Sequence, residues 1–224
     1  MSVRGGVAAL VLATLAAPAA VRADGWRGSG SLALDLRGWQ MEAEGGERTR
    51  AVTAGPRVRA VGGKSALGLA AGVDLELGAT GDGDFAYQVA VLPLGAGLLL
   101  GRSAVIGLVA GAGTSGIAGG TLPIAFALPV ESFAEVSLGS HLRAAAWGRV
   151  VALFGSDGRQ SGAGDAPFGD ELEIGLTLRW DRRRSDWRYA SGNGYQLGAA
   201  YGQAAGAEVV SVLLGYSLDA AGGE

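Results

Sequence analysis

The sequence contains no cysteine and a single histidine, His141, among its 224 residues. A disulfide framework is therefore excluded, and so is a cysteine-ligated zinc site. One histidine is also too few for a histidine-based metal site, unless several copies of the chain contribute ligands to one metal. Basic residues are scarce too, because 18 lysines and arginines stand against 21 acids, and Lys64 is the single lysine. The chain thus lacks the clustered basic surface of a nucleic-acid-binding protein.

Long hydrophobic runs are missing after the first residues of the chain. The richest apolar region, residues 91–113, is interrupted by Pro93 and Arg102 and contains many glycines. A membrane-spanning helix needs about 20 consecutive apolar residues, so no such helix is predicted there. The 41 glycines follow no fixed period, which excludes a collagen-like structure. If the protein enters a membrane, it must do so as a closed barrel of strands.

The first 23 residues have the pattern of an export signal. Arg4 gives a positive start, residues 7–17 are apolar, and Val21-Arg22-Ala23 provides a small-x-small cleavage site. We predict cleavage after Ala23, a barrel domain over 24–218 and a short tail over 219–224. The signal holds two arginines and no acid, so the mature chain has 16 basic and 21 acidic residues and a net charge of −5.

Alternation of apolar and polar residues predicts strands throughout the mature chain. In residues 171–180 the even positions read Leu, Ile, Leu, Leu, Trp and the odd positions read Glu, Glu, Gly, Thr, Arg. Such a strand has one apolar and one charged face. The same pattern predicts an all-β, closed antiparallel transmembrane barrel of ten strands, or of eight if the glycine-rich fourth and fifth are misread. The expected strands cover about 31–42, 48–61, 65–79, 85–98, 103–113, a segment ending in 130–138, 142–154, 171–180, a segment ending in 195–201, and 208–218.

The connections between these strands alternate in length. Tight turns are predicted at 62–64, 101–102 and 139–141, and longer loops rich in Gly and Asp at 78–84, 114–121 and 156–170. Outer-membrane barrels have short periplasmic turns and longer external loops, and residues 181–193 are the exception here. With this orientation, outward-facing aromatics gather at the two ends, as the interfacial girdles of a membrane barrel do. Trp180 and Tyr216 lie at the periplasmic end, and Phe85, Tyr87, Phe154 and Tyr201 at the external end.

In these features the chain resembles the small outer-membrane β-barrel proteins of bacteria, the group with the OmpA-like and OmpX-like barrels. The signal through Ala23, the strand alternations and the closing strand Val209–Leu218 carry the resemblance, which covers the mature chain. It implies location in the bacterial outer membrane, with membrane lipid and the barrel-insertion machinery as partners. The group usually finishes on an aromatic residue, whereas here Leu218 is followed by residues 219–224, and Tyr216 is the candidate substitute. No oligomeric state follows from the sequence.

Charged residues occupy the inward parity of the predicted strands. An unpaired charge in a narrow lumen has a large desolvation free energy, so we expect oppositely charged pairs that fill the barrel. The alternative is a polar path for ions or small solutes. Folding about the 139–141 turn places Glu131 opposite Arg149 and Glu135 diagonal to Arg143. The predicted lumen set is Asp35, Arg37, Arg57, Arg59, Asp74, Glu76, Glu131, Glu135, Arg143, Arg149, Glu173 and Arg179.

No catalytic, cofactor or metal site is predicted. No pair of carboxylates stands out from the lumen set as an acid/base pair, and His141 lies in a predicted turn. Residues 111–116 match a dinucleotide fingerprint, but the segment that follows, with Gly119, Gly120 and Pro123, cannot open a helix. Gly63-Lys64-Ser65 lacks the upstream glycine of a phosphate-binding loop, and Asp82-Gly83-Asp84 is typical of a turn more than of a calcium site.

Two alternatives to a non-enzymatic membrane barrel stay open at this level. One is a barrel enzyme that acts on lipid, which the lack of a histidine constellation disfavours. The other is a soluble secreted β-barrel or sandwich that binds an apolar ligand, with the leucines inside and the charges outside. The soluble and membrane interpretations place the leucines and the charges on opposite sides of the barrel wall. Which face is buried therefore decides between them.

Overall fold

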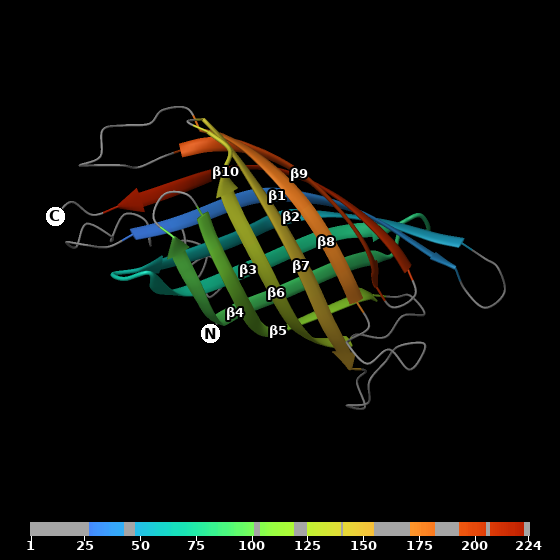
Figure 1. The fold of residues 1–224 in the computed structure, drawn as a ribbon. Helices are drawn as coiled ribbons and strands as arrows, with labels where there is room; N and C mark the ends of the chain where they lie inside the picture. Colours follow the sequence, from blue (N-terminus) through green and yellow to red (C-terminus); the bar gives the residue numbers. More distant parts are fainter. Residues whose placement is uncertain are drawn as a thin grey trace, which may run out of the picture.

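The computed structural model describes residues 27–42, 48–100, 104–118, 125–139, 141–154, 171–181, 193–204 and 207–221. This part of the chain forms ten strands in an antiparallel closed barrel, in which each strand pairs with its sequence neighbours and β1 pairs with β10 (Figure 1). The predicted fold class is confirmed, and the eight-strand alternative is wrong because β4 and β5 both lie in the barrel wall. The strands are β1 (Arg27–Glu42), β2 (Arg48–Gly63), β3 (Leu67–Thr80), β4 (Phe85–Leu100), β5 (Ala104–Ala118), β6 (Ala125–Ser137), β7 (Leu142–Phe154), β8 (Glu171–Asp181), β9 (Asn193–Ala204) and β10 (Ala207–Ala221).

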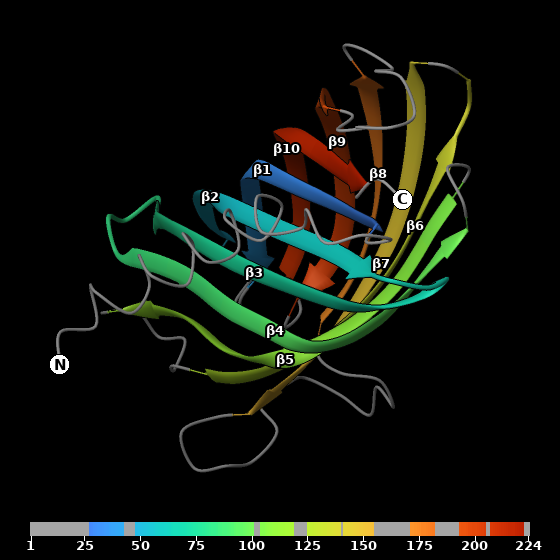
Figure 2. The same ribbon diagram turned by 90° about the vertical axis from the view of Figure 1, so that its left-hand side faces the viewer.

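Closure of the barrel extends its first and last strands. β1 starts at Arg27 rather than near residue 31, and β10 continues to Ala221, so 219–221 of the expected tail are paired with β1. Figures 1 and 2 show β1 (blue) beside β10 (red) along this seam. We call the end where β1 begins and β10 finishes the terminal end, and the opposite end, where β8 begins, the loop end. Residues 1–26, which include the predicted signal, lie outside the described residues.

The two faces of the wall follow the predicted parity. On β8, Leu172, Ile174, Leu176, Leu178 and Trp180 are exposed, and Ile174 and Leu176 reach 63% and 68% exposure. Their alternates Glu171, Glu173 and Arg179 are buried inside. The soluble interpretation required leucines inside and charges outside, so this burial excludes it. Within the described residues, no helix is long and apolar enough to cross a membrane.

The connection after β3 differs from the expected long loop. β3 runs to Thr80 and β4 begins at Phe85, which leaves a tight turn of residues 81–84. Backbone bonds from Thr80 N to Asp84 O (2.8 Å) and from Gly83 N to Thr80 O (3.1 Å) close the turn. Gly83 has φ of +89°, a conformation that a residue without Cβ adopts at little cost. The Asp82-Gly83-Asp84 segment therefore serves as a turn, and the strict alternation of tight and long connections does not hold here.

A bulge at Pro93 changes the parity of β4. The register with β3 shifts between Leu69 and Gly72, and the register with β5 shifts between Val91 and Leu94, so β4 carries one extra residue. Proline cannot donate a ladder hydrogen bond, and bulges tolerate it for that reason. Beyond the bulge, Leu94 and Leu98 are exposed outside, and Leu99 is buried inside.

Part of the interior is apolar. An aliphatic cluster packs inside β2 to β5, and Phe133 of β6 lies against it. The charged interior therefore shares the barrel with an aliphatic cluster, which fills the side of the lumen formed by the glycine-rich strands. The cluster consists of Val61, Ala70, Ala90, Leu92, Leu99, Val105 and Val109.

Candidate functional site

All of the predicted lumen residues point into the barrel. Most are buried, and only Glu135 and Arg143 keep partial exposure, with 18% and 20% of their side chains accessible. They are carried by β1, β2, β3, β6, β7 and β8, and their side chains meet across the interior. Three groups follow one another from the loop end to the terminal end.

The Arg37 cluster lies toward the loop end and consists of Arg37, Asp35, Glu76, Glu171 and Glu173. Arg37 Nη2 donates to Glu173 Oε2 at 2.7 Å, and Asp35 Oδ2 lies 3.9 Å from the same nitrogen. Arg37 Nε is 3.6 Å from Glu76 Oε2, and Arg37 Nη1 is 3.6 Å from Glu171 Oε1. One fully buried guanidinium thus faces four buried carboxylates.

Neutral groups complete the shell of the Arg37 guanidinium. Its Nη1 donates to Gln88 Oε1 at 2.7 Å and its Nε to Ser211 Oγ at 3.2 Å. Ser211 in turn donates to Glu173 Oε1 at 3.0 Å. Thr53 donates to Glu76 Oε2 at 2.9 Å and accepts from Trp39 Nε1 at 3.1 Å.

The Arg59 cluster lies in the middle of the barrel and consists of Arg57, Arg59, Asp74, Glu131 and Arg149. Arg59 Nη1 and Nη2 donate to the two oxygens of Asp74 at 2.6 and 3.0 Å. Arg59 Nε and Nη2 donate to Glu131 at 2.8 and 2.6 Å, and Arg57 Nη2 donates to Glu131 at 2.8 Å. Such charge-assisted, bidentate contacts are the strong class of protein hydrogen bonds.

The predicted ion pair between Glu131 and Arg149 is wrong, although the two residues are direct neighbours in the sheet as expected. Glu131 reaches across the interior to β2, and Arg149 Nη1 instead donates to Asp74 Oδ2 of β3 at 3.1 Å. The reason is geometric. Side chains on adjacent strands stand side by side, whereas a closed barrel lets long side chains meet head to head across the lumen.

The terminal cluster consists of Glu135, Arg143, Arg179 and Asp181. Arg143 Nη1 donates to Glu135 Oε1 at 2.9 Å, which matches the predicted diagonal pair, and Arg143 Nε lies 3.2 Å from Asp181 Oδ2. Arg179 donates from Nε to Asp181 and lies 3.7 Å from Glu135. Glu135 and Arg143 are partly accessible, whereas Arg179 is buried like the residues of the two inner clusters.

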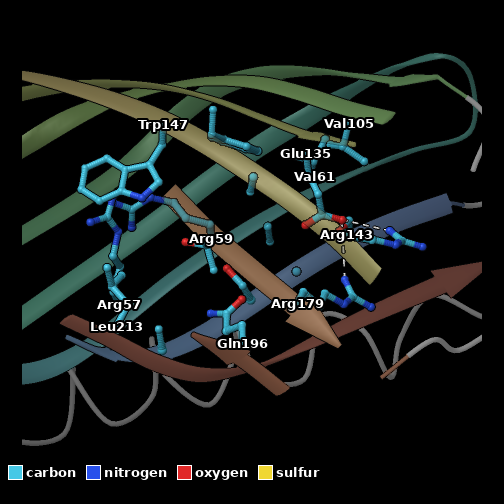
Figure 3. A pocket seen from close by; sticks show the side chains of 18 of the residues that line it. Arg57, Arg59, Val61, Val105, Glu135, Arg143, Trp147, Arg179, Gln196 and Leu213 are labelled. Carbon is cyan, nitrogen blue, oxygen red and sulfur yellow. Dashed lines mark hydrogen bonds and ion pairs between the residues drawn. The ribbon is translucent and has the colours of Figure 1, made fainter. Parts of the chain in front are cut away.

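Two aromatic rings inside the barrel, those of Trp147 and Phe133, each lie over a glycine of the adjacent strand. The Arg57 guanidinium lies 3.6 Å from the centre of the Trp147 ring, a close cation–π contact visible in Figure 3. The ring covers Gly175, where an added Cβ would lie 2.3 Å from Trp147 Cε2. Phe133 covers Gly107 in the same way, at 2.3 Å from its Cζ. Glycine is needed at both positions because the neighbouring ring occupies the space of a side chain.

A small cavity lies between the Arg59 cluster and the terminal cluster (Figure 3). Its volume is about 80 Å³, which suits a few water molecules at ~30 Å³ each and is below the size of ordinary ligand pockets. Arg57, Arg59 and Trp147 line one part of it, and Arg143 and Arg179 line another. With these charged groups in its lining, the cavity is roomy enough for bridging water.

Several buried polar atoms of the described residues have no hydrogen-bond partner. Both oxygens of Asp35 and Oε1 of Glu171 are in this state, as are Arg57 Nη1 and two nitrogens of Arg149, Nε and Nη2. Asp35 Oδ2 is 3.7 Å from Arg57 Nη1, so this carboxylate stands between the Arg37 and Arg59 clusters without bonding to either. Carboxylate oxygens that lie near arginines but accept no hydrogen bond are thus a property of the Arg37 cluster.

Sequence reasoning missed Glu171, Asp181 and Trp147. The parity of β8 already placed Glu171 on the charged face, but it is the first residue of the strand, where boundaries are hardest to assign. Trp147 has the inward parity of β7, and the signal for its role was a glycine directly opposite it, Gly175. Gln88 and Ser211 carry no charge and gave no signal.

The other candidate positions lie apart from the three clusters. His141 is exposed in the turn between β6 and β7, and its carbonyl accepts a bond from Asp181 N at 2.8 Å. Residues 111–116 belong to strand β5, and Lys64 and Ser65 lie in the β2–β3 turn. Among the described residues, no group of three or more His, Cys, Asp or Glu has the arrangement of a metal site.

No protein-family model matches this chain, and no curated protein matches it significantly. Solved structures do match. Ail, the attachment invasion locus protein of Yersinia pestis, is 9% identical over 88% of this chain and 99% of its own, with a TM-score of 0.37. The translocator domain of autotransporter NalP from Neisseria meningitidis is 11% identical over 95% and 97%, with a TM-score of 0.37. The toluene transporter TodX of Pseudomonas putida is 10% identical over 93% of each chain, with a TM-score of 0.35. Similarity at this level assigns neither a family nor an activity.

Proposed function

We propose that this protein is a bacterial outer-membrane β-barrel whose lumen is closed by its own charged side chains. One observation carries the proposal: charged side chains are buried inside the barrel and large apolar side chains are exposed outside, the reverse of a soluble protein. A soluble monomer rarely exposes a contiguous apolar surface beyond a few hundred Å². Lipid accepts such a surface, and a closed barrel leaves no unpaired strand edge in the bilayer.

The dimensions and the aromatic residues support a membrane location. A spanning strand needs about 9–11 residues, and the shortest strand here, β8, has 11. Trp180 is exposed at the terminal end, where Tyr195 and Tyr216 also pack edge to face at 5.7 Å. Phe85 and Tyr87 of β4 stack at 6.0 Å at the loop end, and Tyr201 is exposed toward the same end on β9, across the barrel. The side chain of Phe154 lies outside the described residues. Interfacial aromatics at both ends are typical of membrane barrels.

The orientation follows from the positions of the strand ends. The barrel has an even number of strands, so both of its ends lie on one side, which in outer-membrane barrels is the periplasm. The terminal cluster would then face the periplasm, and the Arg37 cluster would lie toward the cell exterior. Insertion would use the cell's barrel-assembly machinery, with Tyr216 as the last aromatic residue of β10.

The interior supports a structural role or, as a second candidate, a narrow passage for ions. The two inner clusters cross the barrel with buried ion pairs, so a large solute has no route through them. The cavity beside the terminal cluster and the unpartnered carboxylate oxygens favour a hydrated interior that small ions could enter. The proposal assigns no catalytic role and no cofactor.

Cell fractionation tests the membrane location. The mature protein should stay in the membrane pellet through high salt and alkaline washes and should be extracted only by detergent. Recovery in a salt or osmotic-shock fraction would contradict the proposal. Planar-bilayer recording tests the closed lumen, because large and steady conductance in the unmodified protein would show that it is an open porin.

A further inference from the structure

The Arg37 cluster has more negative charge than its basic residue can balance. Four buried carboxylates lie within 3.9 Å of one guanidinium, at contacts of 2.7, 3.6, 3.6 and 3.9 Å. The hydrogen bonds of Arg37 go to Glu173, Gln88 and Ser211. Asp35 and Glu171 receive none, although both are buried and face the guanidinium.

Residues of the Arg59 cluster supply only part of the missing positive charge. Arg57 Nη1 lies 3.7 Å from Asp35 Oδ2, outside hydrogen-bond distance, and the other Arg57 contact is with Glu131. Arg149 directs Nη1 to Asp74 and also faces Glu171, so the two inner clusters together hold six carboxylates against four guanidinium groups. Buried carboxylates without hydrogen-bond donors require a positive charge nearby, because desolvation of an isolated anion is costly.

From this geometry we infer that the loop-end half of the lumen is a cation-selective constriction, which the chain closes with its own cation, Arg37. This inference rests on the proposed membrane barrel and adds its ion selectivity. The ligands around the guanidinium are carboxylate, amide and hydroxyl oxygens, which suit hard cations such as Na⁺ and K⁺. Arg37 therefore both neutralises the site and blocks it.

The consequence is that removing the arginine should open a cation-selective route. Rings of acidic side chains select cations in channels, and the four carboxylates come from β1, β3 and β8, on different sides of the lumen. With the guanidinium gone, a cation could take its place, and its onward path would run beside the ion pairs of the Arg59 cluster to the cavity at the terminal cluster. Anions would be repelled by the same carboxylates.

Planar-bilayer recording of Arg37→Gln in a KCl gradient tests the inference. We expect conductance several-fold above that of the parent, with the reversal potential displaced toward the equilibrium potential of K⁺. Arg37→Lys should remain as closed as the parent, because it keeps the positive charge. Arg50→Gln is the matched control, since it makes the same change on the exposed outer face of β2 near the loop end, and it should leave the conductance unchanged.

Folding is checked by heat-modifiability on gels before recording. If Arg37→Gln does not fold, the double variant Arg37→Gln/Glu173→Gln is used instead. It neutralises both partners of the 2.7 Å ion pair at once and leaves the carboxylates of Asp35, Glu76 and Glu171 in place. The double variant should still prefer K⁺ over Cl⁻, though less strongly. A folded variant that stays closed or prefers Cl⁻ overturns the inference and leaves the membrane barrel standing. If neither the parent nor Arg50→Gln inserts into bilayers, the proposed membrane barrel and the cation-selective lumen are both overturned.

Discussion

Replacement of Glu131 by glutamine measures how much the cross-lumen ion pairs stabilise the barrel. Glu131 is 1% exposed and accepts three hydrogen bonds, one from Arg57 and two from Arg59, at 2.8, 2.8 and 2.6 Å. Glutamine keeps the shape of the side chain but removes the charge and places an NH₂ group toward a guanidinium. Breaking a buried ion pair costs roughly 3–5 kcal/mol, and glutamine retains one acceptor, so we expect the unfolding free energy to fall by about 3 kcal/mol.

A double-mutant cycle identifies the partner of Glu131. Glu131→Gln combined with Arg59→Gln should show a coupling energy of about 1–3 kcal/mol. Either single substitution already removes the contact, so the double variant should lose less stability than the sum of the two single losses. Glu131→Gln combined with Arg149→Gln is the matched comparison. Arg149 is the neighbour of Glu131 in the sheet but bonds to Asp74, so this coupling should be clearly smaller.

The assay is urea unfolding of the barrel in lipid vesicles, followed by tryptophan fluorescence and by heat-modifiability on gels. Refolding and unfolding curves must coincide for the free energies to be comparable. The reasoning is refuted if Glu131 couples more strongly to Arg149 than to Arg59. It is also refuted if the losses from Glu131→Gln and Arg59→Gln simply add.

Three further changes test the faces, the glycine contacts and the export signal. Leu176→Arg should reduce the detergent-extractable membrane fraction, because a charge near the bilayer midplane costs about 2–4 kcal/mol, whereas Thr177→Arg on the inner face should be milder; the reverse order would contradict the outward assignment of the leucines. Gly175→Ala should lower the unfolding free energy by about 1–3 kcal/mol and change the Trp147 fluorescence, because its Cβ would lie 2.3 Å from the ring. Gly148→Ala, whose Cβ would meet only Ser132 Oγ at 4.0 Å, is the control and should change neither. N-terminal sequencing of the exported protein should begin at Asp24, and a start beyond about Leu32 would remove part of β1 and contradict the predicted cleavage site.

The strands and their two faces could be predicted from the sequence because their signal is local. Successive side chains of a strand point to opposite sides, so the leucines and charges of residues 171–180 define two faces without knowledge of any partner strand. The neighbours of each strand were predictable too, since short antiparallel connections pair strands in sequence order. Glu131 and Arg149 are opposed in the sheet for that reason.

Local irregularities weakened the prediction where the period of two is broken. The bulge at Pro93 reverses the outward parity within β4, so neither parity describes the whole strand. The loop expected over 78–84 is instead a short turn, because the ladder between β3 and β4 continues through Ala79 and Phe85. Glycine and aspartate mark a turn in a sequence but do not give its length.

The choice of ion partners was decided by the tertiary structure alone. Closing ten tilted strands into a barrel brings Glu131 to Arg57 and Arg59, separated by 74 and 72 residues, and Arg37 to Glu173, separated by 136. Strand parity fixes that these side chains point inward, but the tilt and stagger of the closed sheet fix which of them reach the same height in the lumen. Glu131 then bonds to two arginines across the interior rather than to Arg149, its neighbour in the sheet. For this reason a barrel with a charged interior is predictable from strand parity, whereas the four carboxylates around one arginine are visible in the folded structure alone.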